Sequence, residues 1–326
     1  MKYIIIIGSN SFSGSHYANY LLKKKYKVIA ISRSKENSQY YLPYKKNDKN
    51  KFFYNLHIGK DTKKIISLVI KYKPEYIINY GAQSMVGESW QKPRDWLNTN
   101  SLQIPILYKE IFDLKIIKKL VHISTPEVYG SSKKILKENY VFNPSTPYAV
   151  SRTTADLFLK ILFENYKSPF VILRASNVYG EYQRLYRIIP KAIDYFIKSK
   201  KLPLHGKGES IRSFIHIDDV CSATYLAMKK GKIGNTYHIS SDNYISIKDL
   251  LKKISKILKV NFAKNIIFTK DREGKDGYYK LSSYKIKKLG WSPKVSLLDG
   301  IKKVIDWYIK NDKKFKKIDF KYIHKK

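Results

Sequence analysis

Apolar runs rich in Ile, Val, Tyr and Phe alternate with segments of helical periodicity along the first half of the chain. A short apolar run predicts a buried strand, and a longer segment with apolar residues every three or four positions predicts a helix. The predicted strands are residues 3–7, 28–32, 52–57, 76–80, 120–124 and 170–174, and the predicted helices are residues 13–24, 62–72, 96–112 and 148–166. This alternation indicates an α/β fold in which helices cover both faces of a parallel sheet.

The regular alternation ends near Asn177, and shorter elements follow. Helical periodicity returns near residues 218–230 and 246–258. We therefore expect a Rossmann-type doubly wound parallel sheet with a smaller C-terminal α/β substrate lobe, and a ligand cleft at the carboxyl ends of the strands. The predicted division assigns residues 1–176 and 212–236 to the dinucleotide-binding Rossmann domain, and residues 177–211 and 237–326 to the smaller lobe.

The composition is that of a folded globular protein. Hydrophobic residues make up 43% of the 326 residues, which supplies a sizeable core and excludes intrinsic disorder. The longest apolar runs fall far short of the roughly 20 residues that a membrane-spanning helix needs, and no leader segment opens the chain. We expect a cytoplasmic protein with no membrane partner. The single cysteine, Cys221, excludes an internal disulfide, and the seven histidines lack the spacing of a metal site.

Lysine and arginine outnumber aspartate and glutamate by 64 to 26, which gives a formal net charge of +38. A nucleic-acid-binding protein usually gathers its basic residues on one face or arm, with aromatic residues placed to stack on bases. Here lysine is spread over nearly every segment, so we interpret the charge as a bias of composition and expect no nucleic-acid partner. A cationic surface of this kind still attracts anionic small substrates.

A turn containing glycine connects the first predicted strand to the first predicted helix, in the segment Gly8-Ser-Asn-Ser11-Phe-Ser-Gly14. Glycine permits a tight turn and a close approach of the backbone to a ligand, and the N–H groups at the start of a helix attract negative charge. The placement between strand and helix therefore predicts a dinucleotide site, with Gly8, Ser11, Phe12 and Gly14 around the pyrophosphate.

The spacing of Gly8, Ser11 and Gly14 is similar to the G-x-x-G-x-x-G pattern of the extended short-chain dehydrogenase/reductase family, with serine at the middle glycine. Other segments resemble landmarks of that family, in the family's order and over nearly the whole chain. These segments are Asn79-Tyr-Gly-Ala-Gln-Ser84, Ser124-Thr-Pro-Glu-Val-Tyr-Gly130, Tyr148-Ala-Val-Ser-Arg152, Arg174-Ala-Ser-Asn-Val-Tyr-Gly180 and Arg212-Ser-Phe-Ile-His-Ile-Asp-Asp219.

Within this family the chain resembles the nucleotide-sugar 4,6-dehydratases of the dTDP-glucose and GDP-mannose types, because Glu127 occupies a slot that is usually small and neutral in 4-epimerases. The resemblance implies that Tyr148 removes the C4 hydroxyl proton of a hexose while a nicotinamide takes the C4 hydride. Glu127 then abstracts the C5 proton, water leaves from C6, and the hydride returns to C6 to give a 4-keto-6-deoxy sugar. A 4-epimerase or 4-dehydrogenase that uses the same tyrosine is the alternative, and a basic binding protein on an inactive scaffold is a third.

Two positions depart from the family pattern. Arg152 stands where the family has the lysine that favours the tyrosine phenolate, and a guanidinium supplies that charge with a different geometry. Pro126 stands where the dTDP-glucose type has an aspartic acid that protonates the departing hydroxyl. Thr125, Glu127 acting in both directions, or an ordered water would then supply this proton, and the sequence leaves the three open.

The cofactor preference is predicted from the end of the second strand, where NAD-specific members carry an acid that accepts from the ribose 2′-hydroxyl. The chain has Ile31-Ser-Arg-Ser34 there, and Arg33 can pair with the 2′-phosphate of NADP. We therefore favour NADP over NAD. The resemblance adds Ala82, Tyr148 and Arg152 to the expected cofactor contacts.

The resemblance also implies contacts to a nucleotide-diphosphate sugar. Asn177, Arg187 and Arg212 correspond to positions that reach the diphosphate or close over the substrate. Ser84 and Thr125 are candidates for hydrogen bonds to the hexose, and a core-facing serine at position 84 is the alternative. Features of both dehydratase types are mixed along the chain, so the nucleotide base stays open.

The predicted helices at residues 96–112 and 148–166 correspond to the pair that forms a four-helix dimer interface in this family. A homodimer is therefore expected by analogy.

Overall fold

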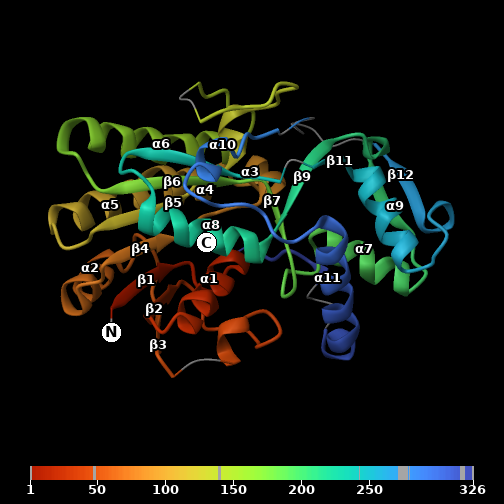
Figure 1. The fold of residues 1–326 in the computed structure, drawn as a ribbon, viewed down its shortest axis with the longest axis horizontal. Coiled ribbons are helices and arrows are strands. Elements are labelled where there is room, and N and C mark those ends of the chain that lie inside the picture. The colour runs from red at the N-terminus through yellow and green to blue at the C-terminus, as the bar shows by residue number, and fades with distance from the viewer. Residues whose placement is uncertain are drawn as a thin grey trace.

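Two parts of unequal size make up the protein in the computed structural model (Figure 1). A large sheet with helices on both of its faces occupies one side, and a smaller group of strands and helices occupies the other. The structure describes residues 2–46, 49–138, 141–241, 243–270, 278, 280–315 and 320–324.

Within these residues the large sheet has seven parallel strands in the order β10-β6-β5-β4-β1-β2-β3. In chain order they are β1 (Tyr3–Ile7), β2 (Lys27–Ser32), β3 (Lys51–Asn55), β4 (Tyr76–Asn79), β5 (Lys119–Ile123), β6 (Phe170–Ala175) and β10 (Asn235–Ile239). Ile4, Ile5 and Ile6 of β1 are fully buried, because side chains on both faces of a covered sheet lie in a core. The strand order reverses between β1 and β4, where folds of this type bind ligands. The predicted Rossmann-type doubly wound sheet is confirmed.

Helices bury both faces of this sheet. On one face α1 (Phe12–Lys23) and α8 (Ile217–Lys230) pack into a core that includes Tyr17 and Met228. On the other face α2 (Thr62–Tyr72), α5 (Ile104–Asp113) and α6 (Pro147–Tyr166) pack into a core that includes Val69 and Ile111. The helices predicted at residues 13–24, 62–72, 148–166 and 218–230 are therefore confirmed.

The helix predicted at residues 96–112 is wrong in one respect, because it is not continuous. The chain leaves β4 through α3 (Val86–Gln91), α4 (Pro93–Trp96) and a π-helical turn, η2 (Leu97–Gln103), before α5 begins. The π-helical turn holds the buried side chain of Asn100, whose hydrogen bonds are described below.

The smaller lobe encloses a core of its own. In the described part of the chain, β11, β9 and β7 form one sheet, and β12 pairs with β8 in another. The strands are β7 (Asn177–Tyr179), β8 (Leu202–His205), β9 (Ile211–His216), β11 (Tyr244–Ser246) and β12 (Ile266–Thr269), and the helices are α7 (Ile188–Ile197), α9 (Ile247–Ile257) and α11 (Leu297–Asn311). Ser246 and Ser296 cap α9 and α11, each accepting a hydrogen bond from the N–H of an aspartate three residues later. The helix predicted at residues 246–258 is confirmed as α9.

Two strands depart from the division that the sequence predicts. Residues 212–216 are predicted to belong with the large sheet, but β9 pairs with β7 and β11 in the smaller lobe. Residues 237–239 are predicted to lie in the smaller lobe, but β10 pairs with β6 and extends the large sheet. The physical reason is that a short apolar run predicts a strand without indicating which sheet it joins. The rest of the division stays a prediction.

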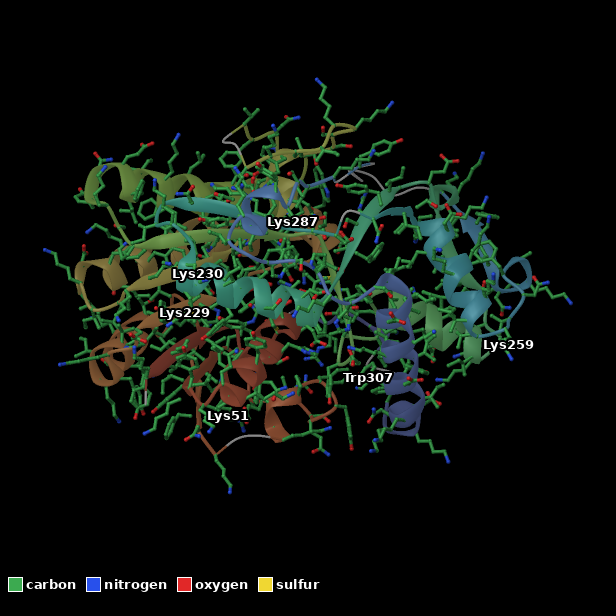
Figure 2. The ribbon with its side chains drawn as sticks, in the orientation of Figure 1. Lys51, Lys229, Lys230, Lys259, Lys287 and Trp307 are labelled. Atoms are coloured by element: carbon green, nitrogen blue, oxygen red, sulfur yellow. The ribbon has the colours of Figure 1, made fainter. Side chains whose placement is uncertain are left out.

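Lysine side chains project from all parts of the molecule (Figure 2). The labelled lysines lie on separate elements of both lobes, namely Lys51 on β3, Lys229 and Lys230 on α8, Lys259 after α9, and Lys287 on α10 (Tyr284–Lys287). Several lysines cover tyrosine rings; the Lys51 ammonium, for example, lies 4.6 Å from the ring centre of Tyr44. Among the described helices, none is long and apolar enough to cross a membrane.

Candidate active site

Gly8 and Gly14 bring the first strand, the first helix and the end of β4 into close contact. Gly8 has a φ angle of +81°, and a Cβ atom there would lie 2.4 Å from the backbone nitrogen of Gly81. A Cβ atom on Gly14 would lie 2.3 Å from the carbonyl oxygen of Gly8. Both positions therefore require glycine, and the resulting turn lets a ligand approach the backbone at the start of α1.

Ser11, at the position of the family's middle glycine, is the N-cap of α1. Its Oγ accepts a hydrogen bond from the N–H of Gly14 at 3.0 Å, and its carbonyl accepts from the N–H of Ser15 at 2.9 Å. The N–H groups of Phe12 and Ser13 precede this first intrahelical bond and point out of the helix N-terminus, where an anion is favoured. The serine therefore stabilises the helix start, and the local geometry still suits a pyrophosphate.

A cavity of about 60 Å³ opens beside this turn, at the carboxyl ends of β1, β2 and β4. Its walls include Gly8, Arg33 and Ala82, so the structure brings together three residues that the sequence predicts for the cofactor. His57 also lines the cavity, and its Nδ1 is buried without a hydrogen-bond partner in the part of the chain that is described. Burial lowers the pKa of this imidazole. The sequence does not identify His57 as a residue of the site, because His57 is only the last residue of a predicted strand.

The loop of Arg33 is held in place by Asn10. Asn10 Nδ2 donates to the carbonyl oxygens of Ser34 at 2.7 Å and Lys35 at 3.0 Å. The Arg33 guanidinium donates to Gln83 Oε1 at 3.4 Å. Burial lowers the pKa of Arg33, so this charge is partly withdrawn from water and would be stabilised by an anion.

Tyr148, Thr125 and Glu127 come together from two elements. Tyr148 lies in the first turn of α6. Thr125 and Glu127 follow β5 directly, at the start of the 3-10 helix η3 (Pro126–Tyr129), and Thr125 Oγ1 accepts from the N–H of Glu127 at 3.3 Å. The Thr125 hydroxyl also lowers the pKa of Tyr148, so it lies close to the phenol. The threonine therefore connects the tyrosine to the turn that carries the glutamate.

Opposing effects determine the pKa of Tyr148. Burial is the largest effect and raises the pKa, and the Glu127 carboxylate raises it further. Arg152, the hydrogen bond from Thr125 and Arg187 lower it. The net result is a pKa above the ordinary value, so the phenol is protonated at neutral pH in the free protein. Arg152 supplies the charge that the sequence predicts, but burial outweighs it.

Arg152 lies one helical turn after Tyr148 and is only 2% exposed. Its Nη2 donates to the carbonyl oxygen of Ile123 at the end of β5. Its Nε and Nη1 are buried and have no hydrogen-bond partner among the described residues. Buried donors of this kind are costly to leave unpaired, and ribose hydroxyls would satisfy them. The residues present therefore fit a dinucleotide that extends from the Gly8 turn to Arg152.

A buried set of polar side chains lies behind Arg152. Asp156 Oδ2 accepts from Arg174 Nη2 and from Ser124 Oγ, each at 2.7 Å, and Asp156 Oδ1 lies 3.3 Å from His122 Nε2. Burial raises the pKa of Asp156, but Arg174 and the hydrogen bonds from His122 and Ser124 outweigh burial and hold it well below its usual range. The carboxylate is thus paired with Arg174, which leaves the charge of Arg152 free to act on Tyr148. The sequence motifs contain these residues but do not indicate their pairing.

Asn100 connects the segment after β4 to the helix of Tyr148. Its Oδ1 accepts from the N–H of Gln83 at 3.0 Å, and its Nδ2 donates to the carbonyl of Gln83 at 2.9 Å and to Ser151 Oγ at 3.0 Å. Ser151 Oγ donates in turn to the carbonyl of Tyr148 at 2.7 Å. Single π-helical turns such as η2 are frequent at functional sites. The sequence does not reveal Asn100, because an asparagine within helical periodicity reads as a surface position.

The smaller lobe supplies three of the predicted substrate residues. Asn177 and Arg212 lie on the adjacent strands β7 and β9. Arg187 is the exposed N-cap of α7, and its charge lowers the pKa of Tyr148, so it lies within electrostatic reach of the tyrosine. Ser84 is exposed after β4, so the alternative of a core-facing serine is wrong. The substrate contacts of all four residues stay predictions.

A family model and several known proteins are similar in sequence to this chain. The family model described as GDP-mannose 4,6 dehydratase matches residues 5–304. The dTDP-D-glucose 4,6-dehydratase of Homo sapiens is 30% identical over 326 residues, which cover 98% of this chain and 93% of the human protein. A trifunctional UDP-glucose 4,6-dehydratase/UDP-4-keto-6-deoxy-D-glucose 3,5-epimerase/UDP-4-keto-L-rhamnose-reductase of Arabidopsis thaliana is 29% identical over 95% of this chain, which spans 47% of that protein.

A solved structure has the same fold over nearly its whole length. DesIV, a dTDP-glucose 4,6-dehydratase from Streptomyces venezuelae crystallised with NAD bound, is similar to this chain with a TM-score of 0.89 and 27% identity. The match covers 96% of this chain and 98% of DesIV.

Proposed function

We propose, from the premise that this chain belongs to the GDP-mannose 4,6-dehydratase family and is an NAD(P)-dependent nucleotide-sugar 4,6-dehydratase of the lyase class, that Tyr148, Thr125, Glu127 and Arg152 carry out its chemistry. The observation that carries this assignment is the position of Thr125 between the two other residues. Its hydroxyl lowers the pKa of Tyr148, and its Oγ1 accepts from the N–H of Glu127. A base for the C4 hydroxyl and a carboxylate for C5 are therefore held in one place.

Tyr148 takes the C4 hydroxyl proton as a phenolate, after its own phenol proton has passed to solvent. A nicotinamide held by the Gly8 turn and Arg152 would supply the acceptor for the C4 hydride and the hydride donor for C6. Arg152 and Arg187 stabilise the phenolate through their charge, and the Thr125 hydroxyl stabilises it by donating a hydrogen bond. The Ile123 carbonyl fixes the Arg152 guanidinium, so this charge does not depend on a flexible side chain.

Glu127 is the base for the second step. A ketone at C4 makes the C5 hydrogen acidic, so Glu127 takes that proton while the C5–H electron pair forms the C5–C6 double bond and the C6–O bond breaks. Pro126 offers no side-chain proton, and the Thr125 hydroxyl is engaged with Tyr148 and the Glu127 N–H. We therefore assign to Glu127 the return of the proton to the leaving oxygen, which departs as water. After the hydride reaches C6, C5 takes a proton that comes from solvent.

Mass spectrometry of the products tests this function. The protein is incubated with NAD or NADP and a panel of UDP-, dTDP-, GDP- and CDP-hexoses. A dehydratase lowers the mass of its substrate by one water, a 4-epimerase leaves the mass unchanged, and a 4-dehydrogenase removes two hydrogens. Loss of one water with one member of the panel supports the proposal and identifies the nucleotide, whereas either other mass change, or no turnover of any hexose, contradicts it.

Substrate binding is assigned to residues of both lobes. Asn177, Arg187 and Arg212 bind the diphosphate, since arginine offers paired donors that match its oxygens. Ser84 and Thr125 bind the hexose hydroxyls. The exposure of Ser84 and Arg187 supports this assignment, because both side chains are open to a ligand from outside.

The preference for NADP over NAD rests on Arg33. The NAD bound to DesIV supports NAD as a cofactor, so the case for NADP comes from this chain's own residues. Arg33 lines the cavity beside Gly8, and Ser32 and Ser34 flank it without an acidic residue. The partly buried Arg33 guanidinium at this strand end would be stabilised by a 2′-phosphate.

The homodimer is proposed to form through a face of η2, α5 and α6. Leu102, Ile106, Leu157 and Ile161 lie on this face and are each 42–53% exposed. Residues four apart on a helix lie on one side of it, so Leu157 and Ile161 form one stripe and Leu102 and Ile106 another. A contiguous apolar surface of this kind indicates a protein interface.

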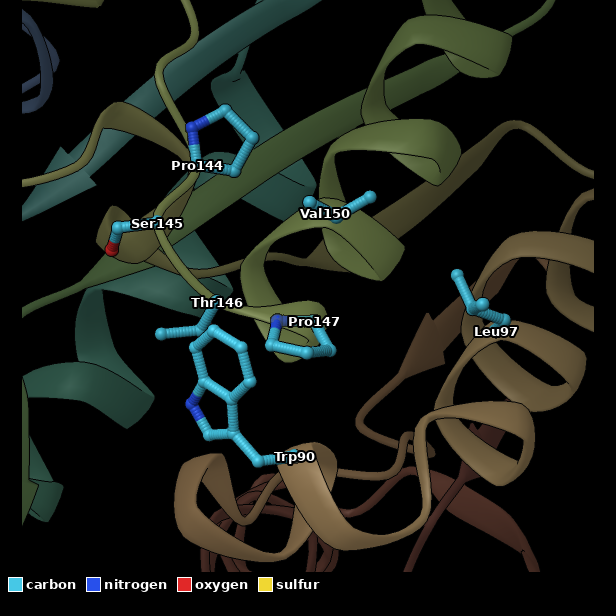
Figure 3. A pocket seen from close by; sticks show the side chains of 7 residues that line it. All are labelled: Trp90, Leu97, Pro144, Ser145, Thr146, Pro147 and Val150. Atoms are coloured by element: carbon cyan, nitrogen blue, oxygen red, sulfur yellow. The ribbon is translucent and has the colours of Figure 1, made fainter. Parts of the chain in front are cut away.

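The apolar face continues into a hollow at the start of α6. Figure 3 shows Trp90 of α3 beside Thr146 and Pro147, with Leu97 and Val150 completing the walls. The hollow has a volume of about 370 Å³ and is lined mostly by apolar side chains. Leu97 and Val150 belong both to the hollow and to the helices of the face, so the proposed interface extends to within two residues of Tyr148.

A further inference from the structure

Residues 320–324, which we call the C-terminal strap, pass from the smaller lobe to helix α4 of the large lobe. Phe320 packs against the core of the smaller lobe. Tyr322 packs edge-on against Tyr186, with ring centroids 5.7 Å apart. The ring of His324 stacks on Trp96 of α4, with centroids 5.1 Å apart and planes at 12°. The strap therefore bridges the two lobes and lies outside the region that matches the family model.

His324 holds the strap to the large lobe. Its Nε2 lies 2.7 Å from Oδ2 of Asp95, and its side chain is only 9% exposed. An ion pair or hydrogen bond that is largely withdrawn from water is screened less than one at the surface. Asp95 and the stacked Trp96 are neighbours in α4, so one short helix provides both contacts.

The strap lies at the border of the proposed cofactor site. Asp95 and Trp96, which hold His324, lie in α4, and α4 leads directly into η2, whose Thr99 lines the cavity beside Gly8. The charges of Arg33 and Arg187 also act on the Tyr322 hydroxyl. Arg33 lines the cavity beside Gly8, and Arg187 acts on Tyr148. The strap thus runs between the residue assigned to the adenosine ribose and a residue assigned to the substrate.

We propose that the C-terminal strap is part of the cofactor site, with Tyr322 closing over the adenosine end of the bound dinucleotide and the contact of His324 with Asp95 acting as the latch that limits its release. This inference rests on the cofactor site proposed above. One hydrogen bond and two ring contacts can open without unfolding either lobe, because such local openings cost far less than global unfolding. A cofactor beneath the strap leaves only when the latch opens, and the strap keeps it bound between turnovers.

The rate of cofactor release tests the proposal directly. Protein loaded with NADH is mixed with excess NAD⁺, and the loss of NADH fluorescence gives the dissociation rate. We expect His324→Ala, and a chain that ends at residue 319, to release NADH about tenfold faster than wild type, the factor that corresponds to one lost contact of this class. Tyr322→Ala should also release it faster. Tyr284→Ala, which alters an exposed tyrosine on α10, is the control and should leave the rate unchanged.

Asp95→Asn alters the partner of His324 in the same contact. Because this variant keeps the full-length chain, the test does not depend on whether the shortened chain folds. If His324 and Asp95 act through one contact, the double variant His324→Ala/Asp95→Asn should release NADH no faster than the faster single variant. Unchanged rates in both single variants would overturn the proposal. Variants that release NADH more slowly and bind it more tightly than wild type would also overturn the proposal, because the strap of wild type would then exclude the cofactor. Failure of the proposed function is distinguishable, since wild type would then show no dinucleotide binding or no turnover of any nucleotide sugar.

Discussion

Arg152 lies one helical turn beyond Tyr148 and lowers the pKa of that tyrosine, while the carbonyl of Ile123 fixes its Nη2. Its Nε and Nη1 face no partner among the described residues. One guanidinium thus combines a charge for the phenolate with donors for ribose hydroxyls, which are the two requirements at this position. The pairing of Asp156 with Arg174 makes this possible, because the buried carboxylate does not neutralise Arg152.

The first prediction separates the charge of Arg152 from its shape. Tyr148→Phe should lower turnover by a factor of about 10²–10⁴, the usual contribution of a general acid–base group, and should leave cofactor binding near wild type. Arg152→Lys should keep substantial turnover, since it retains a positive charge beside the phenol. Steady-state kinetics and calorimetry of cofactor binding measure both effects. An Arg152→Lys protein that binds cofactor but does not turn over would show that the guanidinium makes a contact that lysine cannot.

The second prediction concerns Arg33. Wild type should bind NADP⁺ more tightly than NAD⁺, because the guanidinium offers a charge to the 2′-phosphate. Arg33→Asp should reverse the order, because a carboxylate repels that phosphate and accepts from the ribose hydroxyls. Calorimetric titration of both proteins with both dinucleotides provides the comparison. Equal or tighter binding of NAD⁺ by wild type would contradict this interpretation of Arg33.

The third prediction concerns the stability that Asp156 provides. Asp156→Asn removes the counter-ion of a buried arginine, so the free energy of unfolding should fall by about 3–5 kcal/mol, as found when one partner of a buried pair is lost. The exposed helical pair of Lys109 and Asp113 offers a control, and Asp113→Asn should change stability little. Denaturant unfolding of the three proteins measures the difference.

The Asp156 carboxylate also makes the free energy of unfolding depend on pH, in a direction that its lowered pKa determines. The pKa of Asp156 is lower in the folded protein than in the unfolded chain. Its stabilisation is therefore fully present above the ordinary carboxyl pKa of about 3.9 and is lost as the pH falls toward the lowered value. Below about pH 4, the unfolding free energy of wild type should fall more steeply with decreasing pH than that of Asp156→Asn. If the unfolding free energies of wild type and Asp156→Asn changed in parallel with pH, Asp156 would have the same pKa in the folded protein and in the unfolded chain.

Local patterns in the sequence were enough to predict most of the sheet and the core of the site. The isoleucines of β1 form an uninterrupted apolar run, and Tyr148 and Arg152 are four residues apart, which places them on one side of a helix. Glu127, by contrast, is identified through the resemblance of Ser124-Thr-Pro-Glu-Val-Tyr-Gly130 to the dehydratases, and its role stays a prediction. Each of these conclusions needs only a short window of sequence.

The remaining features depend on contacts between distant segments. Asn100 of the π-helical turn η2 is bonded to Gln83, 17 residues earlier, and the pairing of Asp156 with Arg174 joins a helix to a strand. His324 and Asp95 are 229 residues apart in sequence. No periodicity or motif encodes such pairs, so they emerge only from the folded chain.

The fourth prediction concerns the dimer. Ile161→Glu places a charge on the apolar face of α6 and should shift the protein from dimer to monomer, because a buried unpaired carboxylate is costly. Ile309→Glu is the matched control, since Ile309 is similarly exposed but lies on α11 of the smaller lobe. Analytical ultracentrifugation measures the mass of each protein. A monomeric wild type, or an Ile161→Glu protein that stays dimeric, would contradict the proposed interface.

The fifth prediction concerns Glu127, which distinguishes dehydration from epimerisation or simple oxidation. Glu127→Gln keeps the size of the side chain and removes the base, so formation of the 4-keto-6-deoxy product should slow by about 10²–10⁴. Oxidation at C4 should survive, and a 4-keto sugar that retains its C6 hydroxyl should accumulate on the variant. Glu164→Gln, on the exposed end of α6, is the control and should behave as wild type.

The most direct measurement is the isotopic composition of the product formed in deuterium oxide, read by nuclear magnetic resonance and mass spectrometry. Wild type should release a 4-keto-6-deoxy sugar that carries solvent deuterium at C5, and Glu127→Gln should exchange no deuterium into C5. A wild-type product that retains its C6 hydroxyl, or a Glu127→Gln protein that turns over normally, would show that Glu127 is not the dehydrating base.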